Sequence, residues 1–116
     1  MTTTAQVGGV TVATGHLIGG AWVDSTQTFE TRSPMDWDGD ALAAISRGDN
    51  ATATDAVTAS LDGFETWGAF TPHQRAEVLH RLADLIEEHN DDIAIVESLD
   101  MGFLYESMKQ LSLIHI

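Results

Sequence analysis

The spacing of the apolar residues changes near residue 50 of this 116-residue chain, and that change limits the folds it can adopt. Up to residue 46, short apolar runs are separated by glycine and polar turns, a pattern typical of β-strands. From residue 51 the apolar residues recur at the spacing of one face of an α-helix. The sequence therefore predicts an α/β fold, in which an N-terminal β-hairpin and a short third strand are followed by three to four helices.

We expect the hairpin in residues 16–34, HLIGGAWVDSTQTFETRSP. Its first strand, LIGGAWV, contains a Gly-Gly pair, residues 24–27 form the turn, and residues 28–32 alternate as the return strand. Residues 35–40, MDWDGD, form a second turn, and residues 41–46 form the third strand. So small a sheet has open edges, which favour pairing with further strands or with a partner subunit.

Residues 1–15, MTTTAQVGGVTVATG, show no amphipathic period, and we expect them to be a flexible arm. This segment also lacks the basic start and apolar stretch of a signal peptide.

Helix starts and stops are marked after residue 50. Thr52 and Asp55 have the form of a capping box, and Thr71 begins a second helix with proline at its first position. Asn90 is expected to end the second helix and cap the third, which Gly102 ends. The apolar stripes of the three helices comprise Ala53, Ala56, Val57, Ser60, Leu61, Phe64 and Trp67; Val78, Leu79, Leu82, Leu85 and Ile86; and Ile93, Val96 and Leu99.

The charge balance excludes several classes of function. Asp and Glu number 18 against 5 Lys and Arg, giving a net charge of −13. Such a surface repels nucleic acids and anionic membranes. There is no cysteine, so this chain has no disulfide, no thiolate metal site and no cysteine nucleophile. No apolar run reaches the length of a membrane span, and we expect a cytoplasmic protein.

Few residues suggest chemistry by themselves. His73 and His80 are seven residues apart, about 10 Å along a helix, too far to share one metal ion, so we expect them to face solvent. Glu97 and Asp100 lie three apart on a helix face. They either share a proton or a cation, or belong to a solvated acidic face. No catalytic set surrounds them, so no catalytic residue is assigned, and one hypothesis is a non-catalytic acidic helical interaction module.

The ordered set of motifs resembles the N-terminal part of the aldehyde dehydrogenase superfamily over about residues 16–107. The hairpin carries Gly-x-Trp, Thr-Phe-Glu and a final proline. Phe-x-x-Trp ends the first helix, Arg-x-x-x-Leu-x-x-x-Ala-Asp lies in the second, and Glu-x-Leu-Asp-x-Gly closes the third. The resemblance implies that residues 16–110 are the front, incomplete part of the coenzyme-binding domain of an enzyme that oxidises aldehydes to carboxylic acids with NAD or NADP.

In that family the cysteine nucleophile, the glutamate base and the coenzyme-binding residues lie downstream of the part that this chain resembles. We therefore assign no catalytic or cofactor-binding residue, and expect this fragment to be inactive and to bind no coenzyme tightly. The intact parent is expected to take a small aldehyde and to be a homo-oligomer. Met101, Phe103 and Leu104 replace the family's usual asparagine, lysine and proline. Residues 111–116, LSLIHI, depart from the family pattern and are interpreted as an artefactual tail joined to a truncated gene.

The resemblance also implies one metal site. Some members, such as betaine aldehyde dehydrogenases, hold a structural monovalent cation between the end of this hairpin and the aspartate of the Leu-Asp-x-Gly motif. The matching ligands here are the backbone oxygens of Thr31 and Arg32 and the carboxylate of Asp100. Oxygen ligands suit a hard cation such as K⁺. Arg32 stands where an apolar residue is common, and its charge disfavours a cation unless its side chain points away.

Overall fold

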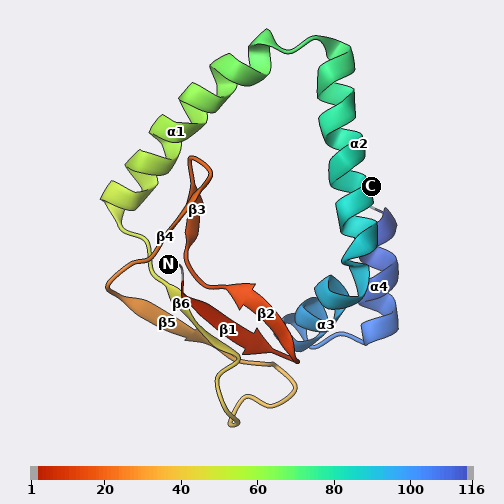
Figure 1. The fold of residues 1–116 in the computed structure, drawn as a ribbon. Helices are drawn as coiled ribbons and strands as arrows, with labels where there is room; N and C mark the ends of the chain where they lie inside the picture. Colours follow the sequence, from red (N-terminus) through yellow and green to blue (C-terminus); the bar gives the residue numbers. More distant parts are fainter. Residues whose placement is uncertain (1–2, 115–116) are drawn as a thin grey trace.

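The computed structural model describes residues 3–114, in which strands come first and helices second (Figure 1). The strands are β1 (Thr4–Val7), β2 (Val10–Ala13), β3 (His16–Ile18), β4 (Ala21–Val23), β5 (Thr28–Thr31) and β6 (Ala43–Ser46). The helices are α1 (Asn50–Ala69), α2 (Pro72–Glu88), α3 (Asn90–Met101) and α4 (Tyr105–Ile114). The predicted α/β class and the order of its elements are confirmed.

Glycine pairs close two of the antiparallel strand pairs. Gly8 and Gly9 have φ angles of 58° and 86°, and Gly19 and Gly20 have φ angles of 57° and 79°. A two-residue hairpin turn of type I′ requires positive φ at both central residues, which glycine adopts without steric cost. β1 therefore pairs with β2, and β3 pairs with β4.

These hairpins correct two predictions. Of the predicted flexible arm, residues 1–15, residues 4–13 form the β1–β2 hairpin, while residues 1–2 lie outside the described residues. The segment LIGGAWV is not one strand, because its glycine pair reverses the chain. β5 pairs instead with the third predicted strand, β6, with Phe29 opposite Ile45. In both segments a Gly-Gly pair between apolar residues is itself the hairpin signal, and it outweighs the longer apolar run.

The cap of α2 is confirmed and that of α1 is corrected. Thr71 Oγ1 accepts a hydrogen bond from the Gln74 backbone N–H at 3.3 Å, and Gln74 Oε1 accepts one from the Thr71 N–H at 2.8 Å. For α1 the capping residue is Asp49, whose carboxylate accepts from the Thr52 N–H at 2.9 Å. Thr52 is thus at the N3 position, the last residue of the box, instead of its first. The sequence contains two overlapping box patterns, and the structure uses the earlier one.

Asn90 does not cap α3. His89 is the single residue between α2 and α3, and its side chain makes no capping hydrogen bond to α3. Asn90 is buried, and its side-chain amide donates to the Lys109 carbonyl of α4 at 3.2 Å. Gly102 ends α3 as predicted, with φ of 71° and its N–H bonded to the Ser98 carbonyl at 3.0 Å.

The predicted tail, residues 111–116, continues α4 up to Ile114, and residues 115–116 lie outside the described part of the chain. Although the sequence after residue 110 departs from the family pattern, the helix continues to Ile114.

The core is small and lies among β1, β6, α3 and α4. Its buried apolar residues are Val7, Ala43, Ala94 and Met108. None of the residues of α1 or α2 is buried. Figure 1 shows these two helices as arms that meet at one end and enclose the β3–β4 hairpin. The radius of gyration is 16.6 Å, against roughly 13 Å for a compact chain of this length. The accessible surface is 8422 Å², against about 6,200 Å² for a folded monomer of this mass.

Candidate functional site

The segment that follows β5 lies against the C-terminal end of α3. A Cβ atom added at Gly102 would be 3.3 Å from Cβ of Pro34 and 3.6 Å from Cγ of Met35. The left-handed backbone of Gly102 turns the chain at this point, so the Glu-x-Leu-Asp-x-Gly segment ends against the residues that follow β5. The cation hypothesis draws its ligands from these two segments.

The three residues of that hypothesis lie on these two ends. Thr31 is the last residue of β5, and its carbonyl accepts a hydrogen bond from the Leu42 N–H at 2.8 Å. Arg32 follows it and is half-buried, whereas Asp100, in the last turn of α3, is exposed. A carbonyl oxygen has two lone pairs, so the bond from Leu42 leaves one acceptor position on Thr31. The donor set of two carbonyls and one carboxylate fits a hard monovalent cation.

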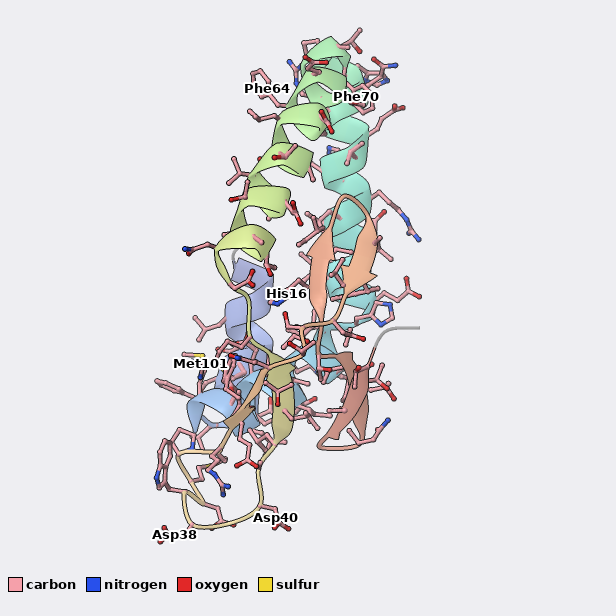
Figure 2. All side chains as sticks on the ribbon, turned by 90° about the vertical axis from the view of Figure 1, so that its left-hand side faces the viewer. His16, Asp38, Asp40, Phe64, Phe70 and Met101 are labelled. Atoms are coloured by element: carbon pink, nitrogen blue, oxygen red, sulfur yellow. The ribbon has the colours of Figure 1, made fainter. Side chains whose placement is uncertain are left out.

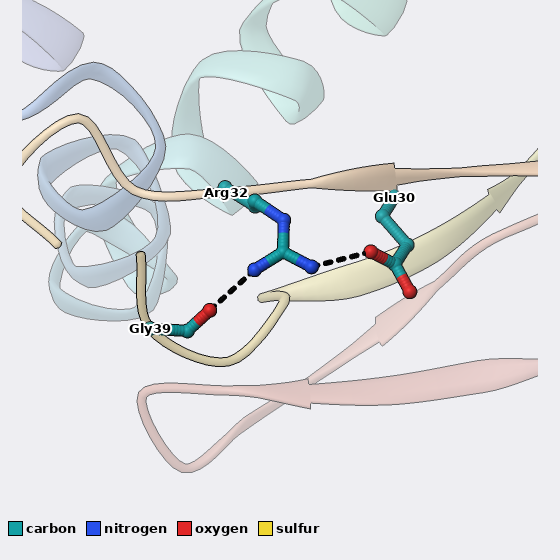
Figure 3. Close-up of polar contacts among 3 residues, drawn as sticks. All are labelled: Glu30, Arg32 and Gly39. Carbon is teal, nitrogen blue, oxygen red and sulfur yellow. Dashed lines mark hydrogen bonds and ion pairs between the residues drawn. The ribbon is translucent and has the colours of Figure 1, made fainter. Parts of the chain in front are cut away.

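The Arg32 guanidinium is held by its own strand and turn (Figure 3). It donates to Glu30 Oε2 at 2.6 Å and to the carbonyl oxygen of Gly39. The Glu30 carboxylate balances the guanidinium charge, although both side chains are partly exposed and the pair contributes little stability. The Arg32 side chain therefore links the turn of residues 35–40 to β5. Both oxygen atoms that accept its hydrogen bonds belong to the β5–β6 hairpin.

The acidic pair Glu97 and Asp100 lies on an exposed face of α3. Within residues 3–114 there is no group of three or more His, Cys, Asp or Glu side chains arranged to hold a metal ion. These observations favour the solvated acidic face over a cation shared by Glu97 and Asp100. His73 and His80 are both exposed, as predicted, and His73 Nε2 lies 3.5 Å from Glu77 Oε1.

A polar cluster that sequence reasoning missed joins α3 to α4. Asp91 Oδ1 accepts hydrogen bonds from Lys109 Nζ at 2.6 Å and from the Tyr105 hydroxyl at 3.0 Å. The bond from Lys109 lowers the pKa of Asp91, and the same bond raises the pKa of Lys109. The bond to Asp91 raises the pKa of Tyr105. Sequence marks Asp91 only as a first-turn acid, since its partners lie on another helix.

A groove of about 550 Å³ runs along α2. It is lined by Phe70, Gln74, Glu77, Val78, Arg81, Leu82 and Leu85. Val78 and Leu82 are 46% and 51% exposed, whereas Leu85 and Ile86 are half-buried, so the predicted apolar stripe exists and its N-terminal part is uncovered. On α1, Leu61 and Phe64 are 62% and 72% exposed. Both helices therefore present faces that another structural element could cover.

No helix within the described residues is both long enough and apolar enough to cross a bilayer.

Comparisons with known proteins agree on one family. The model of the aldehyde dehydrogenase family matches residues 22–113, which includes part of the predicted tail. The cytosolic 10-formyltetrahydrofolate dehydrogenase of Xenopus tropicalis is 34% identical over 106 residues, covering 86% of this chain and 12% of that protein.

Solved structures show the same arrangement of elements. An aldehyde dehydrogenase from Bacillus cereus superposes with a TM-score of 0.78 at 34% identity, covering 84% of this chain and 20% of that one. A betaine aldehyde dehydrogenase from Staphylococcus aureus, in complex with NAD⁺, gives a TM-score of 0.79 at 27% identity, covering 86% of this chain and 20% of that one. This chain thus spans about an eighth of the curated relative and a fifth of the solved chains.

Proposed function

Because the chain belongs to the aldehyde dehydrogenase family, a family of oxidoreductases, we propose that residues 16–110 form the N-terminal part of a coenzyme-binding domain. The enzyme so formed oxidises a small aldehyde to a carboxylic acid with NAD or NADP. The observation that carries this proposal is the family match over residues 22–113, supported by superposition on aldehyde dehydrogenases, one of which holds NAD⁺.

The role of this segment is structural. None of its 116 residues is cysteine, so the thiolate that attacks the aldehyde in this family has no counterpart here. The exposed stripes of α1 and α2 are the surfaces on which the rest of the domain would pack. We propose that the chain alone is inactive, that the parent enzyme is a homo-oligomer, and that it works in the cytoplasm, as the name of the Xenopus relative suggests.

The alternative, a free-standing acidic helical interaction module, predicts a compact molecule with a closed core. The open shape and the absence of any buried residue from α1 and α2 argue against it.

A chimera tests the structural role. The segment of the Bacillus cereus aldehyde dehydrogenase that superposes on this chain is replaced by residues 16–110. We expect a folded enzyme that reduces NAD⁺ in the presence of an aldehyde. The control chimera contains the same segment with Leu61→Asp and Leu82→Asp added, which place charges on the apolar faces of α1 and α2. This control should lose both solubility and activity. Equal activity of the two chimeras would contradict the proposed packing.

The purified 116-residue chain is the second test. It should form no NADH or NADPH from any aldehyde, because the nucleophile is missing. Aldehyde-dependent reduction of either coenzyme by this chain would overturn the proposal that the segment is only structural.

We also propose that Thr31 and Arg32, through their backbone oxygens, and Asp100, through its carboxylate, hold K⁺ at the junction of β5 and α3. The support is the closeness of these two ends, at Gly102 and Pro34, and the engagement of the Arg32 side chain elsewhere. The cation would tie the hairpin to the helix.

Thermal unfolding in KCl and in N-methylglucamine chloride of equal ionic strength tests the cation site. K⁺ should raise the melting temperature of the wild-type chain and of Glu97→Gln, whereas Asp100→Asn should show no difference between the two salts. If Glu97→Gln loses the response as well, the two carboxylates act as a pair. If Asp100→Asn still responds, the proposed ligand set is wrong.

A further inference from the structure

Two Asp-Gly pairs occur in this chain, at Asp38-Gly39 and at Asp62-Gly63. Such a pair can rearrange without an enzyme, because the backbone nitrogen of the glycine can attack the carboxyl carbon of the aspartate before it and close a succinimide ring. Glycine favours this attack, since it has no Cβ atom to obstruct the approach and leaves the backbone free to rotate. The structure places the two pairs in different backbone settings.

Asp38-Gly39 lies in the turn of residues 35–40, outside any helix or strand. Figure 2 shows Asp38 at the outer tip of this turn. The Gly39 N–H donates to the Asp36 carbonyl at 3.2 Å, the long end of the range for such bonds. Rotation of the backbone that brings the Gly39 nitrogen to the Asp38 carboxyl carbon therefore breaks one long hydrogen bond of that nitrogen.

Asp62-Gly63 lies inside α1 (Asn50–Ala69). Asp62 is exposed, as Asp38 is, so access to water does not distinguish the two pairs. In an α-helix the glycine N–H is directed at the carbonyl four residues earlier, away from the side chain of the preceding residue. Ring closure at Asp62 therefore has to wait until α1 opens locally.

We propose that Asp38 is a site of spontaneous conversion to isoaspartate and that Asp62 is protected from it by α1. The Gly39 nitrogen bonds to Cγ of Asp38, and the carboxyl OH leaves with the amide proton as water. A second water molecule opens the ring. Attack at Cγ restores aspartate, whereas attack at the backbone carbonyl carbon of Asp38 leaves the main chain running through Cβ and Cγ. The product has the same composition as the original chain, and the reaction needs only water.

The conversion releases a contact that holds the turn. The Arg32 guanidinium donates to the Gly39 carbonyl and to the Glu30 carboxylate (Figure 3). Isoaspartate adds one methylene carbon to the main chain directly before Gly39, which moves the Gly39 carbonyl away from the guanidinium. Arg32 then keeps its bond to Glu30 and loses its bond to the turn.

Heavy-oxygen water tests the proposal, because each ring opening incorporates one oxygen atom from the solvent. The full 116-residue chain is kept folded in this water at neutral pH, then unfolded and digested with trypsin in ordinary water. Cleavage after Arg32, Arg47 and Arg75 places the two Asp-Gly pairs in separate peptides, residues 33–47 and 48–75. Mass spectrometry should find heavy oxygen in the first peptide and not in the second. An isoaspartate-specific methyltransferase should likewise label only the first.

Variants and a denaturant assign the cause. Asp38→Glu should lose the label, because the longer side chain disfavours the ring, and Asp62→Glu should keep it. In guanidinium chloride both peptides should become labelled, since α1 no longer protects Asp62. Three results would each overturn the proposal: no label in residues 33–47 of the folded chain, label that persists in Asp38→Glu, or equal label in the two peptides of the folded chain.

Brief tryptic digestion of aged, folded chain tests the release of Arg32. Fragments that begin at Ser33 should be richer in isoaspartate than the uncut chain, because Arg32 is bound less firmly in the converted molecules. Equal isoaspartate content in the two fractions would show that the contact between Arg32 and the turn survives the conversion.

Discussion

At the scale of single residues, Gly8 shows how one position can carry two constraints. Its φ of +58° belongs to the left-handed region, and a Cβ atom there would lie 2.5 Å from Ile95 Cγ2 and 2.8 Å from Leu99 Cδ1 of α3. Its neighbour Gly9 has φ of +86°, and a Cβ atom there would meet nothing within 4 Å. The hairpin turn thus requires both glycines, and the contact with α3 requires only the first.

Alanine at these two positions separates backbone strain from crowding. Gly8→Ala should destabilise the chain by about 1–3 kcal/mol more than Gly9→Ala, because only the former also overpacks the contact between β1 and α3. Both variants carry the cost of a left-handed alanine, about 1–2 kcal/mol. Urea unfolding of the two variants measures the difference. Equal midpoints would show that the hairpin does not pack on α3.

Asp49 is a second residue whose effect follows from its contacts. Its bonds from Thr52 lower its pKa below the ordinary value of 3.8. The ionised cap therefore stabilises α1 above the unfolded pKa, and this contribution is lost as the pH falls through the lower, folded pKa. Helix content followed by circular dichroism should decline in that acid range. Asp49→Asn, which caps without a charge, should remove this part of the acid transition, and an unchanged transition would contradict the assignment.

At the scale of elements, α3 and α4 are joined by contacts that run in both directions. Asn90 reaches from α3 to the Lys109 carbonyl, and Lys109 and Tyr105 reach from α4 to the Asp91 carboxylate. This pairing places the last two helices as one unit beside the core residues Ala94 and Met108.

The chain has one tyrosine, so its titration reports directly on this unit. The hydrogen bond to Asp91, and the cost of placing a phenolate beside a carboxylate, raise the pKa of Tyr105 above 10.0. Asp91→Asn should return that pKa toward 10.0 in a spectrophotometric titration. Asp92→Asn, one position along α3, serves as the control and should leave the Tyr105 pKa raised. If both variants titrate as the wild type does, Tyr105 is not bound to Asp91.

The stability contributed by Lys109 depends on pH in the opposite direction to the stability contributed by Asp49. The pKa of Lys109 is raised above 10.5 by the bond to Asp91. The charged pair therefore stabilises α3 against α4 below the unfolded pKa of lysine, and the contribution is lost as the pH rises through the higher, folded pKa.

At the scale of the whole molecule, the core is small and neither α1 nor α2 contributes a buried residue to it. Leu82 of α2 is 51% exposed and Met108 of α4 is 3% exposed. Leu82→Asp should change the stability of the isolated chain by no more than about 0.5 kcal/mol, whereas Met108→Ala should cost roughly 2–5 kcal/mol. Leu82→Asp should also reduce self-association at high concentration, because it removes apolar surface from contact with other copies. Comparable stability losses in the two variants would mean that α2 is covered.

Local chemistry in the sequence determined much of this fold. Thr71, Pro72 and Gln74 start α2 within four residues of one another, and Gly102 ends α3 through its own backbone angles. Such signals need no distant partner, so they can be predicted from the sequence. The ordered motifs also identified the family. The same local reasoning missed the glycine-pair turns, whose signal was present, because a longer apolar run was given more weight.

Other features depend on residues far apart in the chain, and only the tertiary structure decided them. β5 pairs with β6 across the turn of residues 35–40, Asn90 turns to the Lys109 carbonyl instead of capping α3, and the hairpin end meets Gly102. The amphipathic spacing of α1 and α2 predicted their apolar faces, but it did not predict that these faces would be largely exposed to solvent. Periodicity records which side chains share a face, whereas the packing of other elements determines whether that face is covered.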